Sequence, residues 1–347
     1  MTQRIRLAFV AARPPVFVLF ASYAALGLAQ AGRPNAYLPL TETFVAIAGF
    51  LIFSVACNDL ADEAIDRVNL PGDQRRPLVG GGASRAQLST TGIFGALAAL
   101  GTSAAIGWTE VLLVVVGLVL SAAYSLRPFR FADRGVLAPL VLPACYVAVP
   151  FLLGVDAAHR PLTSHELILL GGLYLGFIGR IVLKDFRDVR GDALFGKRTF
   201  LVRHGRRATC TLSMICWSTG TVVIVIGSGH ETSEALVGDA LLGVLAACSV
   251  ALINILSHST EHRRDERLIS AIAILGRGMI VILLAEFSIH AKPIALSLAL
   301  PLLVLLALLV LAQAAAMVAY GPRPRRSDVD RLLTTQDPTP VQSLSRV

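Results

Sequence analysis

Long apolar runs alternate with short polar segments along most of this chain. Ten runs approach the about 20 mostly apolar residues that a helix needs to cross a hydrocarbon layer. They lie at residues 14–31, 40–57, 91–107, 110–125, 136–154, 166–184, 209–227, 236–256, 269–289 and 293–319. The pattern predicts an all-α, polytopic transmembrane helical bundle. The number of spans is nine or ten, because the last two runs adjoin each other and could form one span or two.

Composition supports this membrane interpretation. The 347 residues are 55% hydrophobic and only 16% charged, with a mean hydropathy of +0.68. A soluble domain of this size is much less apolar. We therefore expect residues 1–320 to form a single transmembrane domain. Residues 321–347, rich in Pro, Arg, Ser, Thr and Asp, are expected to be a disordered cytoplasmic tail.

The positive charges follow a topological pattern. Lysines and arginines gather on the cytoplasmic side of membrane proteins. Of the 31 in this chain, 26 lie at the N-terminus, in the tail or in segments that follow even-numbered runs. Both termini are therefore predicted to be cytoplasmic. The net charge of +8 reflects this bias, and the absence of a basic patch interleaved with aromatic residues argues against nucleic-acid binding.

Two acidic clusters each begin where an apolar run ends. The first comprises Asn58, Asp59, Asp62 and Asp66, and the second Asp185, Asp188 and Asp192. Carboxylates three or four residues apart share one face of a helix. Each cluster should therefore present oxygen ligands, which Mg²⁺ requires, in one direction. Both follow even-numbered spans, so we expect them to share a cytoplasmic pocket and to hold a diphosphate between them.

The motifs around these clusters resemble those of the UbiA superfamily of intramembrane prenyltransferases. The first reads N-D-x-x-D-x-x-x-D from Asn58, followed by Arg76-Pro77 and a glycine run from Gly80. The second reads K-D-x-x-D-x-x-G-D-x-x-x-G-x-x-T from Lys184 to Thr199. Arg13-Pro14 is similar to the family's start of the first span, and Tyr124-Ser125 with Pro128 and Arg130 to its element after the fourth. The resemblance covers roughly residues 10 to 260.

The resemblance implies Mg²⁺-dependent transfer of a prenyl group from an allylic prenyl diphosphate to a small aromatic acceptor. The second motif, with Gly191-Asp192 and Gly196, looks closer to the homogentisate- and chlorophyllide-prenylating branches than to the 4-hydroxybenzoate branch. Because the family usually has nine spans, the run at 293–319 predicts one additional C-terminal helix. Arginine outnumbers lysine by 28 to 3, which suggests a bacterial genome rich in G and C and hence a bacterial cytoplasmic membrane.

Roles for individual residues follow from this chemistry. The metal ligands are expected to be Asn58, Asp59, Asp62, Asp66, Asp185, Asp188 and Asp192. The catalytic residues are expected to be Asp62, Asp66, Asp188, Asp192 and Tyr124, the last as a hydrogen-bond donor or as a ring that shields a cation. The substrate-binding cations are expected to be Arg76, Lys184, Lys197, Arg130 and Arg180. Arg180 lies inside an apolar run, where a charge is costly, so it should face the bundle interior.

Three other functions remain open at this point. Some members of the superfamily cyclise the polyprenyl cation, which is terpene synthase chemistry, and others transfer phosphoribose to a lipid phosphate. A transporter would place its carboxylates near the middle of the membrane, whereas these clusters lie at span ends. Prenyl chain length, acceptor identity and oligomeric state are not determined by the sequence.

Overall fold

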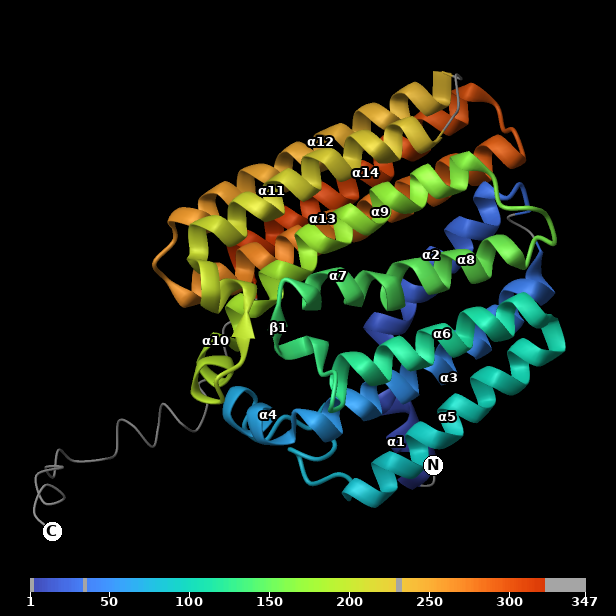
Figure 1. The fold of residues 1–347 in the computed structure, drawn as a ribbon. Helices are drawn as coiled ribbons and strands as arrows, with labels where there is room; N and C mark the ends of the chain where they lie inside the picture. Colours follow the sequence, from blue (N-terminus) through green and yellow to red (C-terminus); the bar gives the residue numbers. More distant parts are fainter. Residues whose placement is uncertain (1–2, 34–35, 229–232, 322–347) are drawn as a thin grey trace, which may run out of the picture.

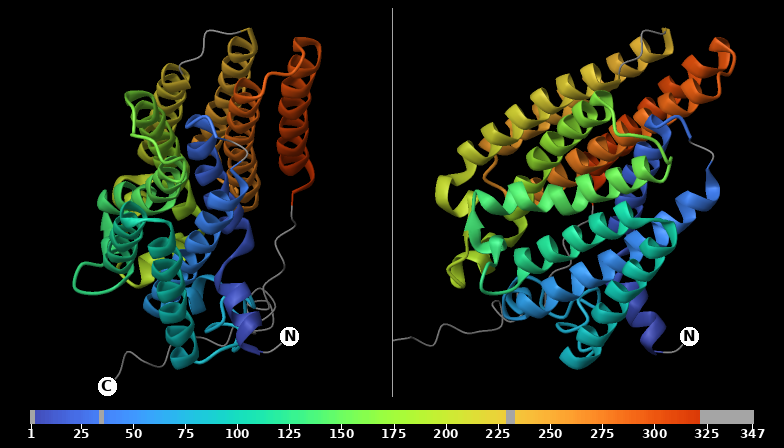
Figure 2. Two further views of the ribbon diagram at one scale, coloured as in Figure 1. Left: turned by 90° about the vertical axis from the view of Figure 1, so that its right-hand side faces the viewer. Right: turned by 45° about the vertical axis from the view of Figure 1, so that its right-hand side comes forward.

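A computed structural model describes residues 3–33, 36–228 and 233–321, without the side chains of 3, 188–191, 193, 233–234 and 262–263. The described chain is a bundle of long helices (Figure 1), which confirms the predicted fold class. The predicted tail lies almost wholly outside the described residues. Figure 2 shows the same helices from two further directions, running side by side along most of their length.

The first part of the chain forms eight helices, joined by short connections. They are α1 (Gln3–Ala11), α2 (Pro14–Gln30), α3 (Tyr37–Ala61), α4 (Glu63–Asn69), α5 (Arg85–Ile106), α6 (Trp108–Ser125), α7 (Leu137–Pro143) and α8 (Val149–Asp156). A wider π-type turn, Ala144–Ala148, joins α7 to α8 after Pro143. Ser84 and Gln87 form a capping box that fixes the start of α5.

The second part of the chain contains the longest helices. They are α9 (Ser164–Ile181), α10 (Asp185–Leu194), α11 (Phe200–Ser228), α12 (Ser233–His258), α13 (His262–Ala291) and α14 (Leu296–Tyr320). Two short strands, β1 (Arg134–Gly135) and β2 (Arg198–Thr199), pair in parallel. The helices α4 and α10 and the strand pair β1–β2 share one end of the bundle, which we call the cluster end (Figure 1).

Nine of the described helical segments are long and apolar enough to cross a membrane, and ten if α1 and α2, bent by 57°, form one broken span. This matches the predicted nine to ten spans. The run at 293–319 forms the separate helix α14, as predicted. Helix α11 begins at Phe200, before the predicted span, but bends at Gly205, where φ is 77°.

In each half of the bundle, the helix that leads into an acidic cluster packs closely on the next long helix. A Cβ atom at Gly49 of α3 would lie 2.4 Å from the backbone oxygen of Gly95 on α5. A Cβ atom at Gly172 of α9 would lie 2.8 Å from the backbone oxygen of Gly220 on α11. Small residues of this kind let membrane helices approach each other. Both clusters therefore rest on rigid helix pairs.

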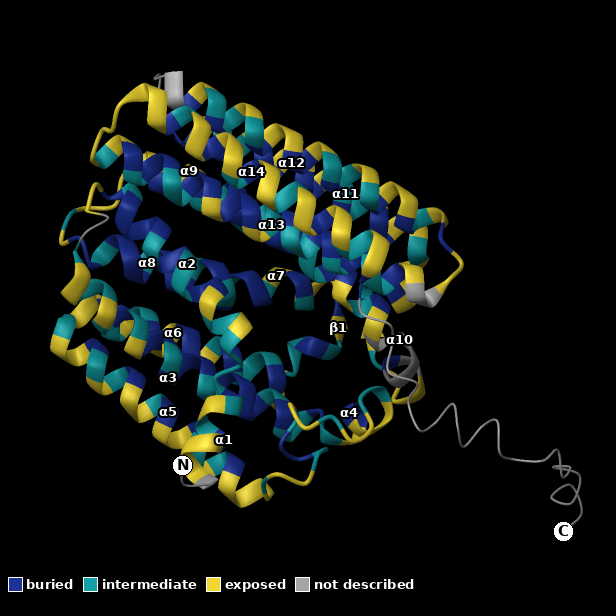
Figure 3. Cartoon of the chain, turned by 180° about the vertical axis from the view of Figure 1, so that it is seen from behind, coloured by how far each residue is buried: buried dark blue, intermediate teal, exposed yellow. Residues whose placement is uncertain are grey.

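The outer faces of the helices carry most of the exposed apolar side chains (Figure 3). On α14 these include Leu298, Leu305 and Leu309, which are each more than half exposed. Such a surface is costly in water and favourable against lipid. The burial pattern therefore agrees with a chain embedded in a membrane.

Candidate active site at the cluster end

The first acidic cluster lies at a break between two helices. Asn58 and Asp59 belong to the last turn of α3, and Asp66 lies on α4. Asp62 lies between the helices, with φ −102° and ψ 9°. The helix that the spacing predicts is therefore interrupted at Asp62, although Asn58 Nδ2 still donates a hydrogen bond to Asp62 Oδ2 at 3.0 Å, as expected for residues four apart on one face. The break allows Asp59 and Asp62 to meet different partners.

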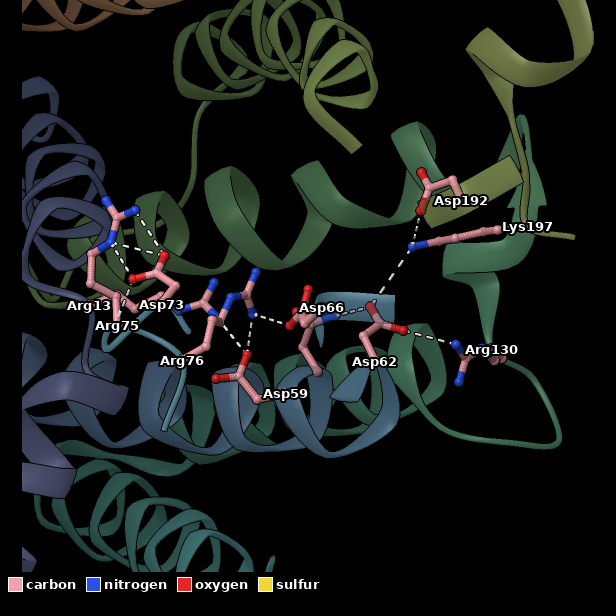
Figure 4. A network of polar contacts seen from close by, with 11 residues as sticks. Arg13, Asp59, Asp62, Asp66, Asp73, Arg75, Arg76, Arg130, Asp192 and Lys197 are labelled. Carbon is pink, nitrogen blue, oxygen red and sulfur yellow. Dashed lines mark hydrogen bonds and ion pairs between the residues drawn. The ribbon is translucent and has the colours of Figure 1, made fainter. Parts of the chain in front are cut away.

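Each aspartate of the first cluster is buried against cationic side chains (Figure 4). Asp59 Oδ1 accepts hydrogen bonds from Arg76 and from Arg13, whose Nη2 lies at 2.5 Å. Arg76 Nη1 also lies 3.1 Å from Asp66 Oδ2. Buried carboxylates need such partners because they lose the hydration of water. The cluster is thus a network of charges.

Arg13 is a member of this network that the sequence did not predict as a site residue. From the sequence, Arg13 contributes to the topological charge bias and, with Pro14, to the family resemblance, but neither by itself indicates a role in the site. In the structure it precedes Pro14 with φ 42° and ψ 74°, in the left-handed region. This unusual backbone turns the chain between α1 and α2, and the side chain reaches Asp59, 46 residues away in sequence. In the sequence, the Arg13-Pro14 pair is the one feature that could have indicated this role.

The second cluster lies on a continuous helix. The 3-10 turn Val182–Lys184 joins α9 to α10, which carries Asp185, Asp188 and Asp192. Asp192 is only 2% exposed. The side chain of Asp188 lies outside the described residues. Helix α10 packs on α4, so the two clusters lie on neighbouring elements.

Lys197 connects the two clusters. Its Nζ lies 3.6 Å from Asp192 Oδ1 and 3.8 Å from Asp62 Oδ2. Strand β2 begins directly after Lys197 and pairs with β1. The other side of Asp62 is bound by Arg130, whose Nη2 donates to Oδ1 at 2.8 Å. The strand pair thus ties together the two loops that carry Lys197 and Arg130.

Two adjoining cavities, of about 40 and 50 Å³, lie between the clusters. Tyr124, Lys184 and Lys197 line both of them. Among the predicted metal ligands, those that line either cavity are Asn58, Asp62, Asp185 and Asp192. The two clusters therefore face the same space in the described part of the chain.

The remaining predicted site residues lie around this space or away from it. Arg76 and Arg130 bind carboxylates of the first cluster rather than lining the cavities. Asp59 and Asp66 also lie behind the cavity wall, against Arg76. Arg180 lies apart from the clusters and lines a different cavity. Their roles as ligands or substrate-binding residues stay predictions.

Two ionisable groups at the cluster end have shifted pKa values. Burial raises the pKa of Asp66 to about 6, although the neighbouring Arg76 acts in the opposite direction. Burial acts to lower the pKa of Lys197, but the charges of Asp62 and Asp192 outweigh it and raise that pKa above its ordinary value. Lys197 is therefore positively charged at neutral pH.

The donor set fits a magnesium ion that is held together with a diphosphate. No three Asp, Glu, His or Cys side chains converge on one point in the described residues, so the protein alone forms no metal cage there. Mg²⁺ typically takes one or two carboxylates and completes its shell with waters and phosphate oxygens. Asp62 and Asp192 supply such carboxylates on either side of Lys197. Asp59 Oδ2 is also buried without a hydrogen-bond partner among the described groups.

Comparison with known families gives an independent result. The model of the UbiA prenyltransferase family matches residues 18–272 of this chain. The match includes both acidic clusters and ends within α13. It covers more than half of the chain.

Individual relatives and structures agree with this match. The chain is 30% identical to the bacteriochlorophyll synthase 34 kDa chain of Chloroflexus aurantiacus, over 57% of this chain and 62% of that protein. It is 28% identical to homogentisate phytyltransferase 1 of Arabidopsis thaliana, over 61% of this chain and 56% of that protein. These matches span about three fifths of each relative's length.

The fold is also similar to that of a solved structure. A UbiA homologue from Archaeoglobus fulgidus, bound to GPP and Mg²⁺, superimposes with a TM-score of 0.64 and 18% identity. The alignment covers 81% of this chain and 99% of that one. At this identity the likeness shows the fold alone.

Proposed function

The chain belongs to the UbiA prenyltransferase family, and from this we propose that it transfers a prenyl group from an allylic prenyl diphosphate to an aromatic acceptor within the membrane. The proposal includes a requirement for Mg²⁺. The relative named homogentisate phytyltransferase 1 supports the choice of an aromatic acceptor.

The observation that carries the proposal is the convergence of both acidic clusters on one lysine-lined space. Asp62 and Asp192 lie within 4 Å of Lys197 Nζ, one from each cluster. Lys184 lines the same cavities. Alternating carboxylates and cations suit a metal-bound diphosphate, whose oxygens need both metal ions and N–H donors.

The chain's own residues would divide the work of holding the leaving group. Bound magnesium would supply a Lewis acid that stabilises negative charge on pyrophosphate oxygens. The metal ligands would be Asn58, Asp62, Asp66, Asp185, Asp188 and Asp192, whereas Asp59 would mainly hold Arg13 and Arg76. Lys184 and Lys197 would contact phosphate oxygens directly, and fixed donors of this kind stabilise charge as it develops. Arg76 and Arg130 would keep the carboxylates of the first cluster in position and reach the diphosphate from behind.

The reaction would proceed by electrophilic substitution. The bond between the allylic carbon and the diphosphate oxygen breaks, and its electron pair leaves with pyrophosphate. An electron-rich ring carbon of the acceptor then forms a bond to the allylic carbon. The proton on that ring carbon passes to pyrophosphate or to a nearby carboxylate, which restores aromaticity. Tyr124, which lines both cavities, would shield the cation with its ring.

We propose a location in a bacterial cytoplasmic membrane, and the distribution of charge supports placing the cluster end on the cytoplasmic side. Arg67, Arg130 and Arg206 all belong to segments at the cluster end, whereas Arg160 and Lys292 belong to connections at the other end. Positive residues concentrate on the cytoplasmic side. The prenyl donor would therefore enter its site from that side.

The experiment is a reconstitution with candidate substrates. The protein in lipid nanodiscs is incubated with Mg²⁺ and geranyl, farnesyl or geranylgeranyl diphosphate, with and without phenolic acids. Pyrophosphate and lipid products are followed together. We expect pyrophosphate release that depends on Mg²⁺ and on a phenolic acid, with a prenylated ring as product. The Asp62→Asn variant serves as the control for the site.

Other outcomes would replace the proposal. Pyrophosphate release without an acceptor, with cyclic hydrocarbons or alcohols as products, would identify a terpene cyclase. Release only with a phosphoribosyl diphosphate and a lipid phosphate would identify phosphoribosyl transfer. The absence of release with every prenyl donor would contradict prenyl transfer.

A further inference from the structure

A third cavity lies deeper in the bundle than the acidic clusters. It measures about 40 Å³ and is enclosed by α2, α9, α11 and α13. Arg180 is the one charged residue among the described residues that line it. Arg180 precedes Asp185 by five residues, so it lies about 8 Å from the second cluster along the helix. We call this space the Arg180 cavity.

Arg180 has no carboxylate partner among the side chains that the structure describes. Its guanidinium lies over the ring of Phe177, 5.8 Å from the centroid. The ionisable groups that act on it are a phenol, Tyr23, and two further cations, Arg277 and Arg187. An arginine inside a membrane span normally pairs with an acid or marks a ligand path. Among the described side chains, the charged groups that act on Arg180 are therefore cations.

Trp217 supplies a second donor without an acceptor to the same cavity. It is 3% exposed and lines the cavity, and its indole Nε1 has no hydrogen-bond partner among the described groups. The ring fits between two glycines: Cβ atoms at Gly179 and Gly276 would lie 2.9 Å from its Cδ1 and Cη2 atoms. These glycines directly precede Arg180 and Arg277. The structure thus places a buried N–H donor in the same cavity as Arg180.

The Arg180 cavity is separated from the cluster-end cavities by a pair of aromatic rings. The rings of Phe177 and Tyr146 have centroids 5.9 Å apart. Phe177 lines the Arg180 cavity, and Tyr146 lines the cavity that contains Asp62 and Tyr124. A volume of about 40 Å³ holds about three water-sized groups, which is the size of a carboxylate. An aromatic ring attached to that carboxylate would extend towards the ring pair.

We propose that the Arg180 cavity binds the oxyanion of the acceptor, through Arg180 and the indole N–H of Trp217. The acceptor class is an aromatic acid whose ring extends from the cavity towards Phe177 and Tyr146. The guanidinium and indole donors form charge-assisted hydrogen bonds to the carboxylate. The identity of this anion as an acceptor rests on the proposed prenyl transfer, whereas the binding of an oxyanion here does not.

Tryptophan fluorescence tests the binding directly, because the chain has only two tryptophans. Trp108 is 79% exposed at the start of α6, so a Trp108→Phe background leaves Trp217 as the sole emitter. This protein is titrated with 4-hydroxybenzoate, with homogentisate, with the neutral 4-hydroxybenzamide and with glycerol phosphate. We expect a saturable change in fluorescence with the aromatic acids. The amide should bind about tenfold more weakly, because it lacks the charge that strengthens the hydrogen bond to Arg180.

Matched variants separate the site from the fold. Arg180→Gln should abolish the response to the acids, and Arg180→Lys should restore part of it. Arg277→Gln is the control for loss of a nearby charge, because Arg277 acts on Arg180 but does not line the cavity, and it should keep the response. Equal responses to acid and amide, a response retained in Arg180→Gln, or a response to glycerol phosphate alone would overturn the carboxylate site.

Kinetics separate this inference from the proposed function. Arg180→Gln and Trp217→Phe should each raise the KM for the acceptor about tenfold, because each removes one hydrogen bond to its charged group. The KM for the donor should not change. Equal effects on both KM values would contradict an acceptor site. If no donor ever releases pyrophosphate, prenyl transfer fails while the fluorescence titration still decides whether the cavity binds an oxyanion.

Discussion

The two acidic clusters have nearly the same sequence spacing but different surroundings. The first spans a break between α3 and α4, and its carboxylates contact Arg13, Arg76, Arg130 and Lys197. The second lies on one helix, α10, and among the described contacts Asp192 pairs with Lys197. The same spacing of aspartates therefore does not give the two clusters the same contacts.

This difference divides the first cluster into two parts. Asp59 lies behind the cavity wall, where it holds Arg13 and Arg76. Asp62 lines one of the two adjoining cavities, and Asp192 lines the other. We infer that Asp59 contributes mainly to the stability of the fold and that Asp62 and Asp192 contribute mainly to turnover. The predictions below test this division.

The largest effect is expected from Asp59→Asn, as a loss of stability. The change leaves two partly buried guanidinium groups without their shared carboxylate. Removing one partner of a buried ion pair costs about 3–5 kcal/mol, and the partial exposure of Arg13 places the expected cost near the lower limit. Thermal unfolding in detergent measures it. Asp73→Asn, at an exposed pair with Arg75, is the control and should change stability by at most about 1 kcal/mol.

Asp62→Ala should instead reduce turnover. The loss of one electrostatic contact to the leaving group typically lowers kcat by about 10²–10³-fold. Asp192→Ala should have an effect of similar size, measured as Mg²⁺-dependent pyrophosphate release. Both variants should keep a cooperative unfolding transition. Full activity in either one would show that the site does not use both clusters.

A smaller effect is expected from pH. The pKa of Asp66 is about 6, so this carboxylate gains a proton and loses its charge as the pH falls through 6. A proton then competes with the metal ion, and the Mg²⁺ concentration for half-maximal activity should rise by up to about tenfold per pH unit below 6. Asp66→Asn should remove this dependence. An unchanged acid limb in that variant would assign the dependence to another group.

The smallest effect on turnover is expected from Arg277→Gln. Arg277 lies on α13, lines none of the three cavities described above and is exposed in the absence of lipid. Its substitution should alter thermal stability more than activity, with a change in turnover equivalent to about 0.5 kcal/mol or less. A large loss of turnover with unchanged stability would show that Arg277 belongs to the site.

The sequence predicted the fold class and both clusters because apolar length and charge spacing are local properties. It did not predict the break at Asp62, where packing of α4 on α10 overrides local helix continuity. It also missed Arg13, whose contact with Asp59 depends on a left-handed backbone turn and on tertiary packing. Arg180 was predicted to face the bundle interior, but only the structure reveals its separate cavity.

The central claim is that both clusters bind one metal–diphosphate complex. Its most direct test is an anomalous-scattering map of crystals grown with Mn²⁺ and a non-hydrolysable prenyl thiolodiphosphate. The account predicts Mn²⁺ ligated by Asp62 from the first cluster and by Asp192 or Asp188 from the second, with the diphosphate between them and Lys197 in contact with it. Metal and diphosphate bound by one cluster alone, with the other still paired only to protein cations, would contradict it.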